Sequence, residues 1–162
     1  MTTINDTPPR LLADAMLGKL ARWLRILGYD TLYMPDDDVR IAQRARAEGR
    51  IVLTRDHGLA QRRGLRTLLI DAQDLDTQLA EVIAALGRPV DAAPRCMLCN
   101  GKLRRIPVEV ARSFVPAYVA ETQTLFHRCA ECGKIYWQGT HWQGIVSQLR
   151  LKVGMSNSHD EV

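Results

Sequence analysis

Short apolar runs alternate with segments of helical periodicity in the first ninety residues. Four apolar runs have the length of buried strands, and they span residues 11–13, 31–34, 51–53 and 67–70. Between them, apolar positions recur three and four apart in three segments, residues 15–27, 39–48 and 75–86. A chain in which short buried strands alternate with amphipathic helices predicts an α/β domain with a largely parallel sheet flanked by helices.

The first helical segment has one apolar side and one basic side. Its apolar side is formed by Leu17, Leu20, Ala21, Leu24 and Leu27. Its other side carries three basic residues spaced three apart, Lys19, Arg22 and Arg25. Gly28 is placed to end this helix. The basic side is a candidate surface for the phosphate groups of a substrate.

The chain changes character after the last of these helices. Gly87, Pro89 and Pro94 mark a linker. We therefore expect a first domain over residues 1–90 and a smaller second one over 91–153, in which the periodic stretch 142–153 predicts a C-terminal helix. The polar end, residues 154–162, is expected to be a flexible tail.

All four cysteines lie in the second part of the chain. Cys96 and Cys99 form one CxxC knuckle, Cys129 and Cys132 form another, and 29 residues separate the two. Four thiolates close a tetrahedral Zn²⁺ site with no open position, which makes the metal structural, and a β-hairpin between the knuckles would make this part a zinc ribbon. A redox CxxC pair and an iron–sulfur cluster are the alternatives, and we favour zinc because neither knuckle lies in a thioredoxin-like βαβ unit.

Aromatic residues follow the second knuckle. Tyr136 and Trp137 stand between basic and amide side chains, where they can stack on unpaired bases or fill the thin core of a small ribbon, and the sequence favours neither interpretation. His141 is interpreted as a packing or hydrogen-bonding residue, since four thiolates already complete the zinc site.

Acidic residues follow each predicted strand. They are Asp14, the run Asp36, Asp37 and Asp38, then Asp56 and Asp71. In a parallel sheet the residues that follow the strands gather at one edge, where open α/β sheets place their active sites. Carboxylates gathered there would repel each other unless a hard cation such as Mg²⁺ or Mn²⁺ bound them. Such a centre beside a basic helix suits the cleavage of a phosphodiester.

Each of these residues also has a plainer interpretation. Asp36 and Asp37 are favoured as a turn and a helix cap, and Asp71 as a cap before the last helix. Asp14 and Asp56 are stronger candidates because each interrupts the junction between a buried strand and a helix. The hydroxyl of Thr54 lies one side-chain alternation from Asp56 and can position a carboxylate or a water molecule. A phosphotransfer domain is disfavoured because the lysine it needs after a late strand is missing: Lys19 is the only lysine before residue 102.

Charge is unevenly distributed along the chain. The net charge is +4, and residues 1–92 carry 13 basic and 13 acidic side chains, whereas residues 93–162 carry 9 and 5. Arginine outnumbers lysine by 18 to 4, which suits bidentate phosphate contacts or reflects a GC-rich genome. Neither a membrane-spanning run of roughly 18 apolar residues nor a signal segment is found, so we expect a cytoplasmic protein.

Several segments resemble signatures of the Mut-seven C-terminal RNase family, a branch of the PIN-like nucleases. Residues 13–31 resemble its opening signature, ADAMLGKLARWLRILGYDT, and residues 50–56 its second, RIVLTRD. Residues 96–101, CMLCNG, and 132–142, CGKIYWQGTHW, are similar to its C-terminal zinc ribbon.

The resemblance implies a PIN-like fold, RNA as substrate and metal-dependent ribonuclease activity. The implied acidic centre consists of Asp14, one of Asp37 or Asp38, and Asp56, and Asp38 fits best because it opens a helix. These carboxylates would hold Mg²⁺ or Mn²⁺, while the basic residues of the first helix would position the phosphate backbone. The alternative is a non-catalytic module that binds RNA through the zinc ribbon.

Overall fold

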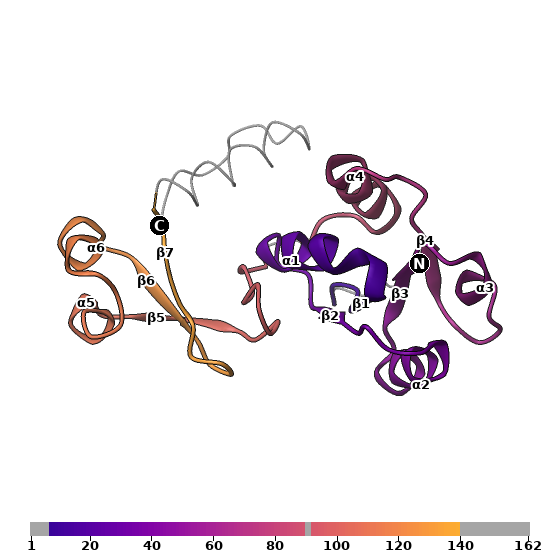
Figure 1. The fold of residues 1–162 in the computed structure, drawn as a ribbon, viewed down its shortest axis with the longest axis horizontal. Coiled ribbons are helices and arrows are strands. Elements are labelled where there is room, and N and C mark those ends of the chain that lie inside the picture. The colour runs from indigo at the N-terminus through magenta and orange to yellow at the C-terminus, as the bar shows by residue number, and fades with distance from the viewer. Residues whose placement is uncertain (1–6, 90–91, 140–162) are drawn as a thin grey trace, which may run out of the picture. The chain divides into compact units, whose positions relative to one another are not determined.

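The computed structural model describes residues 7–89 and 92–139 (Figure 1). The chain forms two compact units, Met1–Lys102 and Leu103–Val162. The predicted helix over 142–153, the tail over 154–162 and His141 lie outside the described residues. The division predicted near residue 90 stays a prediction.

The first unit is built on a four-stranded parallel sheet with the strand order β2-β1-β3-β4. Its strands are β1 (Leu11–Ala13), β2 (Thr31–Tyr33), β3 (Ile51–Thr54) and β4 (Thr67–Leu69). Leu12 pairs with Leu32 on one side and with Val52 on the other. Every residue of β1 and β3 is buried, as expected for central strands covered on both faces. The predicted parallel α/β architecture is confirmed.

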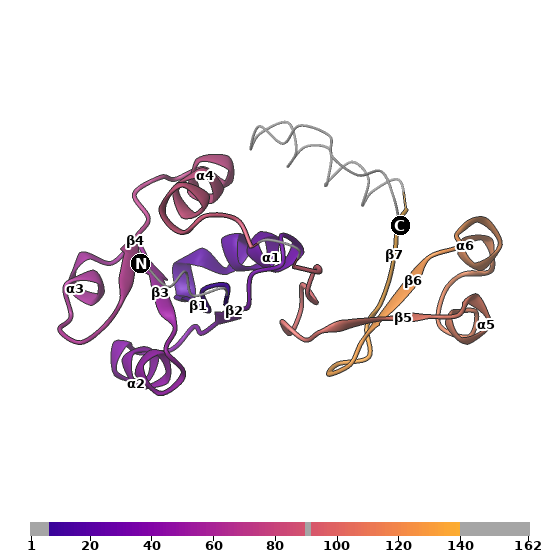
Figure 2. The same ribbon diagram turned by 180° about the vertical axis from the view of Figure 1, so that it is seen from behind.

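Helices cover both faces of this sheet. They are the 3₁₀ turn η1 (Ala15–Leu17), α1 (Gly18–Ile26), α2 (Asp38–Glu48), α3 (His57–Ala60) and α4 (Leu75–Leu86). Helices α1 and α4 lie on the opposite side of the sheet from α2 (Figures 1 and 2). On the α2 side, Leu12 and Val52 pack against Ile41, Ala45 and Leu59. On the other side, the predicted apolar stripe of α1 is buried at Leu17, Leu20, Ala21 and Leu24.

Residues 92–102 belong to the first unit and include the first cysteine knuckle. Arg25 reaches this segment from α1: its side chain is buried, Nη1 donates to the carbonyl of Met97 at 2.7 Å and Nε donates to the carbonyl of Thr31 at 2.8 Å. Asn100, with φ of 69°, turns the chain in the left-handed region, and its Oδ1 accepts the N–H of Thr31 at 2.9 Å. These bonds fix the knuckle onto the edge strand β2.

A buried arginine links the amino ends of neighbouring strands in this sheet. Arg50, which precedes β3, donates through Nη1 to the carbonyl of Leu11 at 3.0 Å and to Oδ1 of Asp30 at 2.8 Å. Asn100 donates to the same Oδ1 at 2.8 Å, and Arg95 lies within ion-pair distance of Oδ2. Burial by itself raises the pKa of Asp30, but these hydrogen bonds and the charges of Arg50 and Arg95 outweigh it and lower the pKa from 3.8 to about 2.

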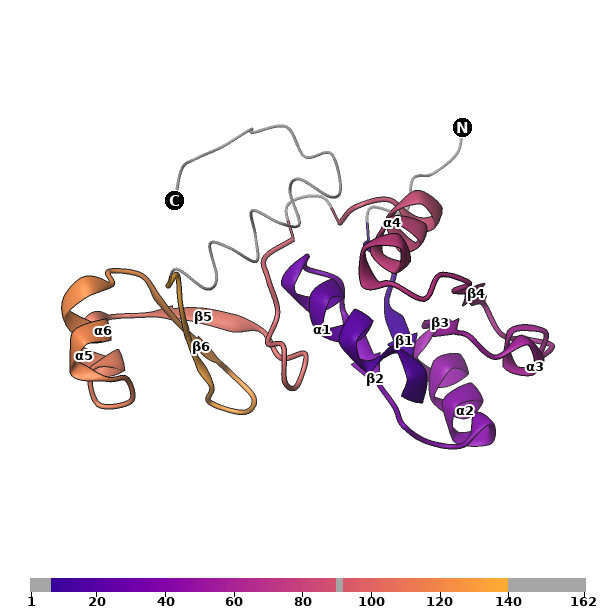
Figure 3. The same ribbon diagram turned by 45° about the horizontal axis from the view of Figure 1, so that its top comes forward.

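The second unit is a three-stranded antiparallel sheet with two short helices. Its strands β5 (Leu103–Ile106), β6 (Phe126–Cys129) and β7 (Ile135–Trp137) pair in sequence order. Helices α5 (Val108–Ala111) and α6 (Ala117–Thr122) lie together at one end of this sheet (Figure 3). The core consists of Ala111, Val119, Phe126 and Ile135, and Trp137 packs against it.

From the sequence, a β-hairpin was expected between the two knuckles. The structure has two short helices between the strands of this hairpin. The chain leaves β5 at Pro107 and forms both helices before it returns as β6, and Pro107 and Pro116 each stand at the N-cap of one of these helices. The helices supply Ala111 and Val119 to a core that three short strands cannot fill alone. The packing of Trp137 agrees with its interpretation as a core residue.

No helix within residues 7–89 and 92–139 is long and apolar enough to span a bilayer.

The network around Asp30 predicts a pH-dependent contribution to stability. Because the pKa of Asp30 is lower in the folded chain than its ordinary value of 3.8, its contribution is fully present above pH 3.8 and is lost as pH falls toward 2. Asp30→Asn should lower the free energy of unfolding by about 2 kcal/mol at pH 7, and the difference from wild type should shrink to near zero at pH 2. Urea unfolding monitored by circular dichroism measures this. Asp71→Asn, at an exposed position, is the matched control, and equal losses for both variants would contradict the assignment.

Candidate functional site

Asp14 lies at the carboxyl end of the central strand β1. Its backbone N–H donates to the carbonyl of Leu53 at 3.2 Å, which continues the β1–β3 pairing by one residue. Its side chain caps η1, with Oδ1 accepting the N–H of Met16 at 3.1 Å, and the residue is 7% exposed. The carboxylate is therefore held in place by the backbone and is largely shielded from solvent.

Thr54 connects this carboxylate to the next strand end. Its side chain is fully buried, and its Oγ1 donates a hydrogen bond to Oδ2 of Asp14 and accepts the N–H of Asp56 at 2.9 Å. One hydroxyl thus bridges the Asp14 side chain and the Asp56 backbone. The sequence pointed to Thr54 through its two-residue spacing from Asp56, and the parallel register, which pairs Ala13 with Leu53, brings it beside Asp14.

Asp56 is exposed and caps α3. Its Oδ1 accepts the N–H of Leu59 at 2.9 Å. A Cβ on Gly58 would lie 3.0 Å from the same oxygen, so glycine keeps this approach open. In the described part of the chain, neither Asp14 nor Asp56 forms an ion pair with a basic side chain. Both carboxylates keep lone pairs for a further ligand.

The three aspartates at the start of α2, Asp36, Asp37 and Asp38, make different contacts. Asp37 is the N-cap of α2, where its Oδ1 accepts the N–H of Arg40 at 2.9 Å. Arg40 also pairs with Asp36 at 3.5 Å, so both residues have a basic partner, in line with the cap interpretation. Asp38 is exposed in the first turn of α2. Asp71 is exposed beyond β4.

The three candidate carboxylates do not form a closed ligand group. Within residues 7–89 and 92–139, the four cysteines are the only group of three or more potential ligands close enough to hold a metal ion. Hydrogen bonds of the Thr54 hydroxyl link Asp14, Thr54 and Asp56, and among the described residues no such bond joins Asp38 to them.

The three basic residues of α1 differ in their exposure to solvent. Lys19 and Arg22 are exposed on the helix that follows Asp14. Arg25 was expected beside them, but it is 6% exposed and its guanidinium is bound to the carbonyls of Thr31 and Met97. The three-residue spacing placed it on the polar side of an isolated helix, whereas the knuckle segment covers that position in the fold. Arg25 is therefore a structural residue in this unit.

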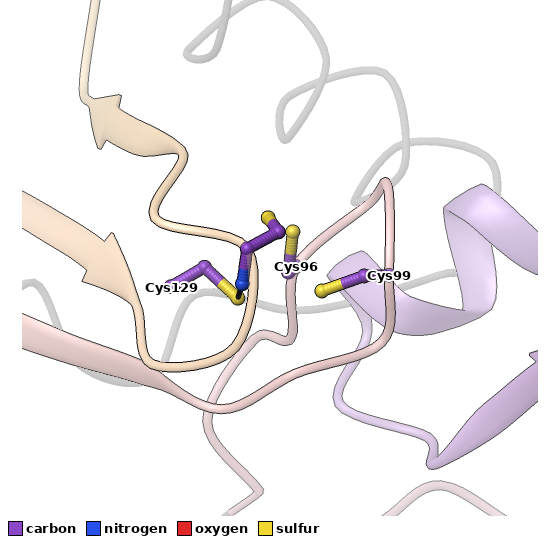
Figure 4. A group of neighbouring side chains, drawn as sticks. Cys96, Cys99 and Cys129 are labelled. Atoms are coloured by element: carbon purple, nitrogen blue, oxygen red, sulfur yellow. Dashed lines mark hydrogen bonds between the residues drawn. The ribbon is translucent and has the colours of Figure 1, made fainter.

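The four cysteines form a compact cluster. Their Sγ atoms all lie within 4.8 Å of one another, and Cys96 and Cys129 are buried while Cys99 and Cys132 are exposed. Figure 4 shows the sulfur atoms of Cys96, Cys99 and Cys129 close to one another. Four sulfurs around Zn²⁺ at about 2.3 Å would lie roughly 3.8 Å apart, so the cluster fits a tetrahedral zinc site. The N–H of Cys132 donates to Sγ of Cys129 at 3.5 Å, as in a knuckle turn.

Asn100 and Asp30 are residues whose roles the sequence did not reveal. Asn100 follows Cys99 directly, and its side chain joins the knuckle to Thr31 and Asp30. The sequence CxxC-Asn-Gly indicates a tight turn, and so the left-handed backbone conformation of Asn100 could be expected from it. The partners of its amide come from 69 and 70 residues away and appear only in the folded chain.

One protein-family model matches nearly the whole described chain. It is the Mut7-C RNAse domain, and the match covers residues 9–149. This interval contains the candidate carboxylates and both cysteine knuckles. Neither a curated protein nor a solved structure matches the chain.

The hydroxyl of Thr54 should stabilise the fold by joining two strand ends. Thr54→Val leaves Oδ2 of Asp14 and the N–H of Asp56 without this buried partner, so the free energy of unfolding should fall by about 1–3 kcal/mol. Thr67→Val is the matched control, because the Thr67 hydroxyl makes one bond to the carbonyl of Ala60 in a partly exposed place. Urea unfolding of both variants measures the difference, and a Thr54→Val loss no larger than that of Thr67→Val would contradict the bridging role.

The cysteine cluster should bind one Zn²⁺ per chain. Native mass spectrometry of the purified protein should show this stoichiometry, and a chelator should release the metal and lower the melting temperature because zinc binds only the folded site. Cys96→Ser should lose the metal, whereas Asp14→Asn should keep it. Purified protein with an iron–sulfur absorption spectrum, or with no bound zinc, would contradict the assignment.

Proposed function

The chain belongs to the Mut7-C RNAse domain family, and from this membership we propose that it is a metal-dependent ribonuclease that hydrolyses phosphodiester bonds in RNA. The observation that carries the proposal is the contact of Asp14, Thr54 and Asp56 at the carboxyl ends of two neighbouring parallel strands. This is the edge at which open α/β sheets place their active sites.

In this proposal Asp14 and Asp56 hold a divalent cation, Mg²⁺ or Mn²⁺. Mg²⁺ is usually bound by one or two carboxylates together with water and substrate phosphates, so two protein carboxylates are enough for such a site. Neither is neutralised by a basic side chain among the described residues. Asp38 is retained as a third ligand, because it opens the helix after β2, the strand next to β1. Asp37 is assigned to the helix cap.

The residues of the chain prepare the site for an anionic substrate. Thr54 donates to Oδ2 of Asp14 and so fixes the orientation of that carboxylate, while Oδ1 is fixed by the N–H of Met16. Lys19 and Arg22, exposed on α1, bind the phosphate backbone. When bound, the cation would polarise the scissile phosphodiester and stabilise the negative charge that develops in the reaction.

A second candidate function is binding of RNA without cleavage. The observation that favours it is the excess of basic side chains in residues 93–162, which include the strands of the second unit. In this case the protein would bind RNA without turnover, binding would survive removal of Mg²⁺, and loss of zinc would abolish it. A cleavage assay with added Mg²⁺ or Mn²⁺ separates the two functions.

Asp14→Asn should abolish metal-stimulated cleavage of single-stranded RNA. The chain should still fold, with a lower free energy of unfolding, because an amide nitrogen replaces one of the two accepting oxygens of Asp14. Asparagine still caps η1, but it removes a negative charge from the proposed cation site. The rate of cleavage should fall by at least about 100-fold, which is the usual effect of removing one charge-stabilising group from an active site. Gel analysis of labelled RNA measures cleavage, and circular dichroism measures folding.

Asp74→Asn is the matched control for this variant. Asp74 is also an N-cap aspartate, at the start of α4, and its Oδ1 accepts the N–H of Thr77 at 2.9 Å. It lies outside the proposed centre, so this variant should cleave RNA like wild type. Full activity of Asp14→Asn would refute the proposed ribonuclease centre, and wild-type protein that binds but does not cleave would favour the second function.

A further inference from the structure

Two arginines lie directly opposite each other on the sheet of the second unit. Arg104 of β5 pairs with Arg128 of β6, and both are exposed. Residues directly opposite in an antiparallel pair project from the same face, and like charges there are destabilising. Among the described residues, neither guanidinium forms an ion pair. The pair is therefore a concentration of positive charge that an anion would relieve.

The same two arginines line an open hollow of about 570 Å³. Its remaining wall is formed mainly by the turn of the second knuckle, residues 129–133. Gly133 in this turn has φ of 78°, and a Cβ there would lie 3.5 Å from Nη2 of Arg128, so the turn and the guanidinium are close neighbours. Glu131 is the one carboxylate at the wall, and it pairs with neither arginine. The hollow is thus open to solvent, and its charged lining consists of two arginines, Glu131 and the two cysteines of the second knuckle, which are thiolates when zinc is bound.

An aromatic ring fixes one of the arginines. The guanidinium carbon of Arg128 lies 5.1 Å from the centroid of Phe114, within cation–π range. Phe114 lies between α5 and α6 and is 59% exposed, although it is a large apolar residue. The ring therefore holds Arg128 while much of its own surface stays open to a ligand.

We propose that Arg104 and Arg128 form a binding site for a backbone phosphate of single-stranded RNA, and that the base next to this phosphate stacks on Phe114. Arginine forks bind phosphate oxygens in bidentate geometry, and exposed aromatic rings beside a basic groove are platforms for unpaired bases. The inference rests on the proposed function only for the choice of RNA as ligand. It assigns substrate binding to residues outside the acidic centre.

The test measures binding separately from cleavage. The full chain with Asp14→Asn and bound zinc is titrated into a fluorescein-labelled single-stranded RNA, without added Mg²⁺, and fluorescence anisotropy gives the dissociation constant. Arg104→Gln in this background should weaken binding by about tenfold, the usual effect of losing a charge-assisted hydrogen bond. The slope of the logarithm of affinity against the logarithm of salt concentration should become shallower by roughly 0.7.

Arg105→Gln is the matched control. It removes the same charge from the neighbouring position of β5, whose side chain projects from the opposite face. Binding should change by less than about twofold in this variant, because the general charge of the protein contributes little compared with a direct contact. Equal weakening by Arg104→Gln and Arg105→Gln would overturn the site.

Three further variants separate binding from folding. Arg104→Glu places opposite charges across the strands, so it should keep or raise the melting temperature while it abolishes the RNA contact. Glu131→Gln should strengthen binding, because it removes the negative charge from the wall of the hollow. Phe114→Leu should weaken binding of single-stranded RNA by about tenfold and leave binding of duplex RNA nearly unchanged. Wild-type affinity in Arg104→Glu would overturn the inference, and it would leave the cleavage result with Asp14→Asn unaffected.

Discussion

The pairing of β1 with β3 positions the candidate centre. Ala13 pairs with Leu53, and the next residue on each strand is Asp14 or Thr54. A shift of this register by one residue would turn the Thr54 side chain to the other face of the sheet, and its hydroxyl could no longer bridge Asp14 and Asp56. The complete burial of both strands stabilises the register, because a shifted strand would exchange its side chains between two different helical layers.

The carboxyl ends and the amino ends of the parallel strands carry different kinds of side-chain contacts. Residues that follow the strands, such as Asp14 and Asp56, lie at one edge, and residues that precede them, such as Asp30 and Arg50, lie at the other. The second edge carries a dense network of hydrogen bonds and ion pairs, which also fixes Asn100 of the first knuckle. Basic side chains therefore neutralise carboxylates at the structural edge, whereas Asp14 and Asp56 have no such partner among the described residues. This contrast supports a ligand-binding role for the free carboxylates.

The second unit carries the two arginines that we propose as a site for an RNA phosphate. Its sheet is too small to bury two faces, and the helices α5 and α6 complete its core at one end. Arg104 and Arg128 are exposed on two neighbouring strands of this sheet. In the proposed function, a contact made here adds binding energy through residues other than those of the acidic centre, and enzymes can use such energy to position the reacting group.

The sequence by itself determined the strands, the helices, the parallel sheet and the two cysteine knuckles, because each is encoded by local periodicity or by spacing within a few residues. It also indicated Asp14, Thr54 and Asp56 through their places at strand ends. Only the tertiary structure decided which of these side chains meet, that Arg25 is buried under a segment 72 residues away, and that Arg104 faces Arg128. Those outcomes depend on contacts between distant segments and on strand register, which local pattern does not encode.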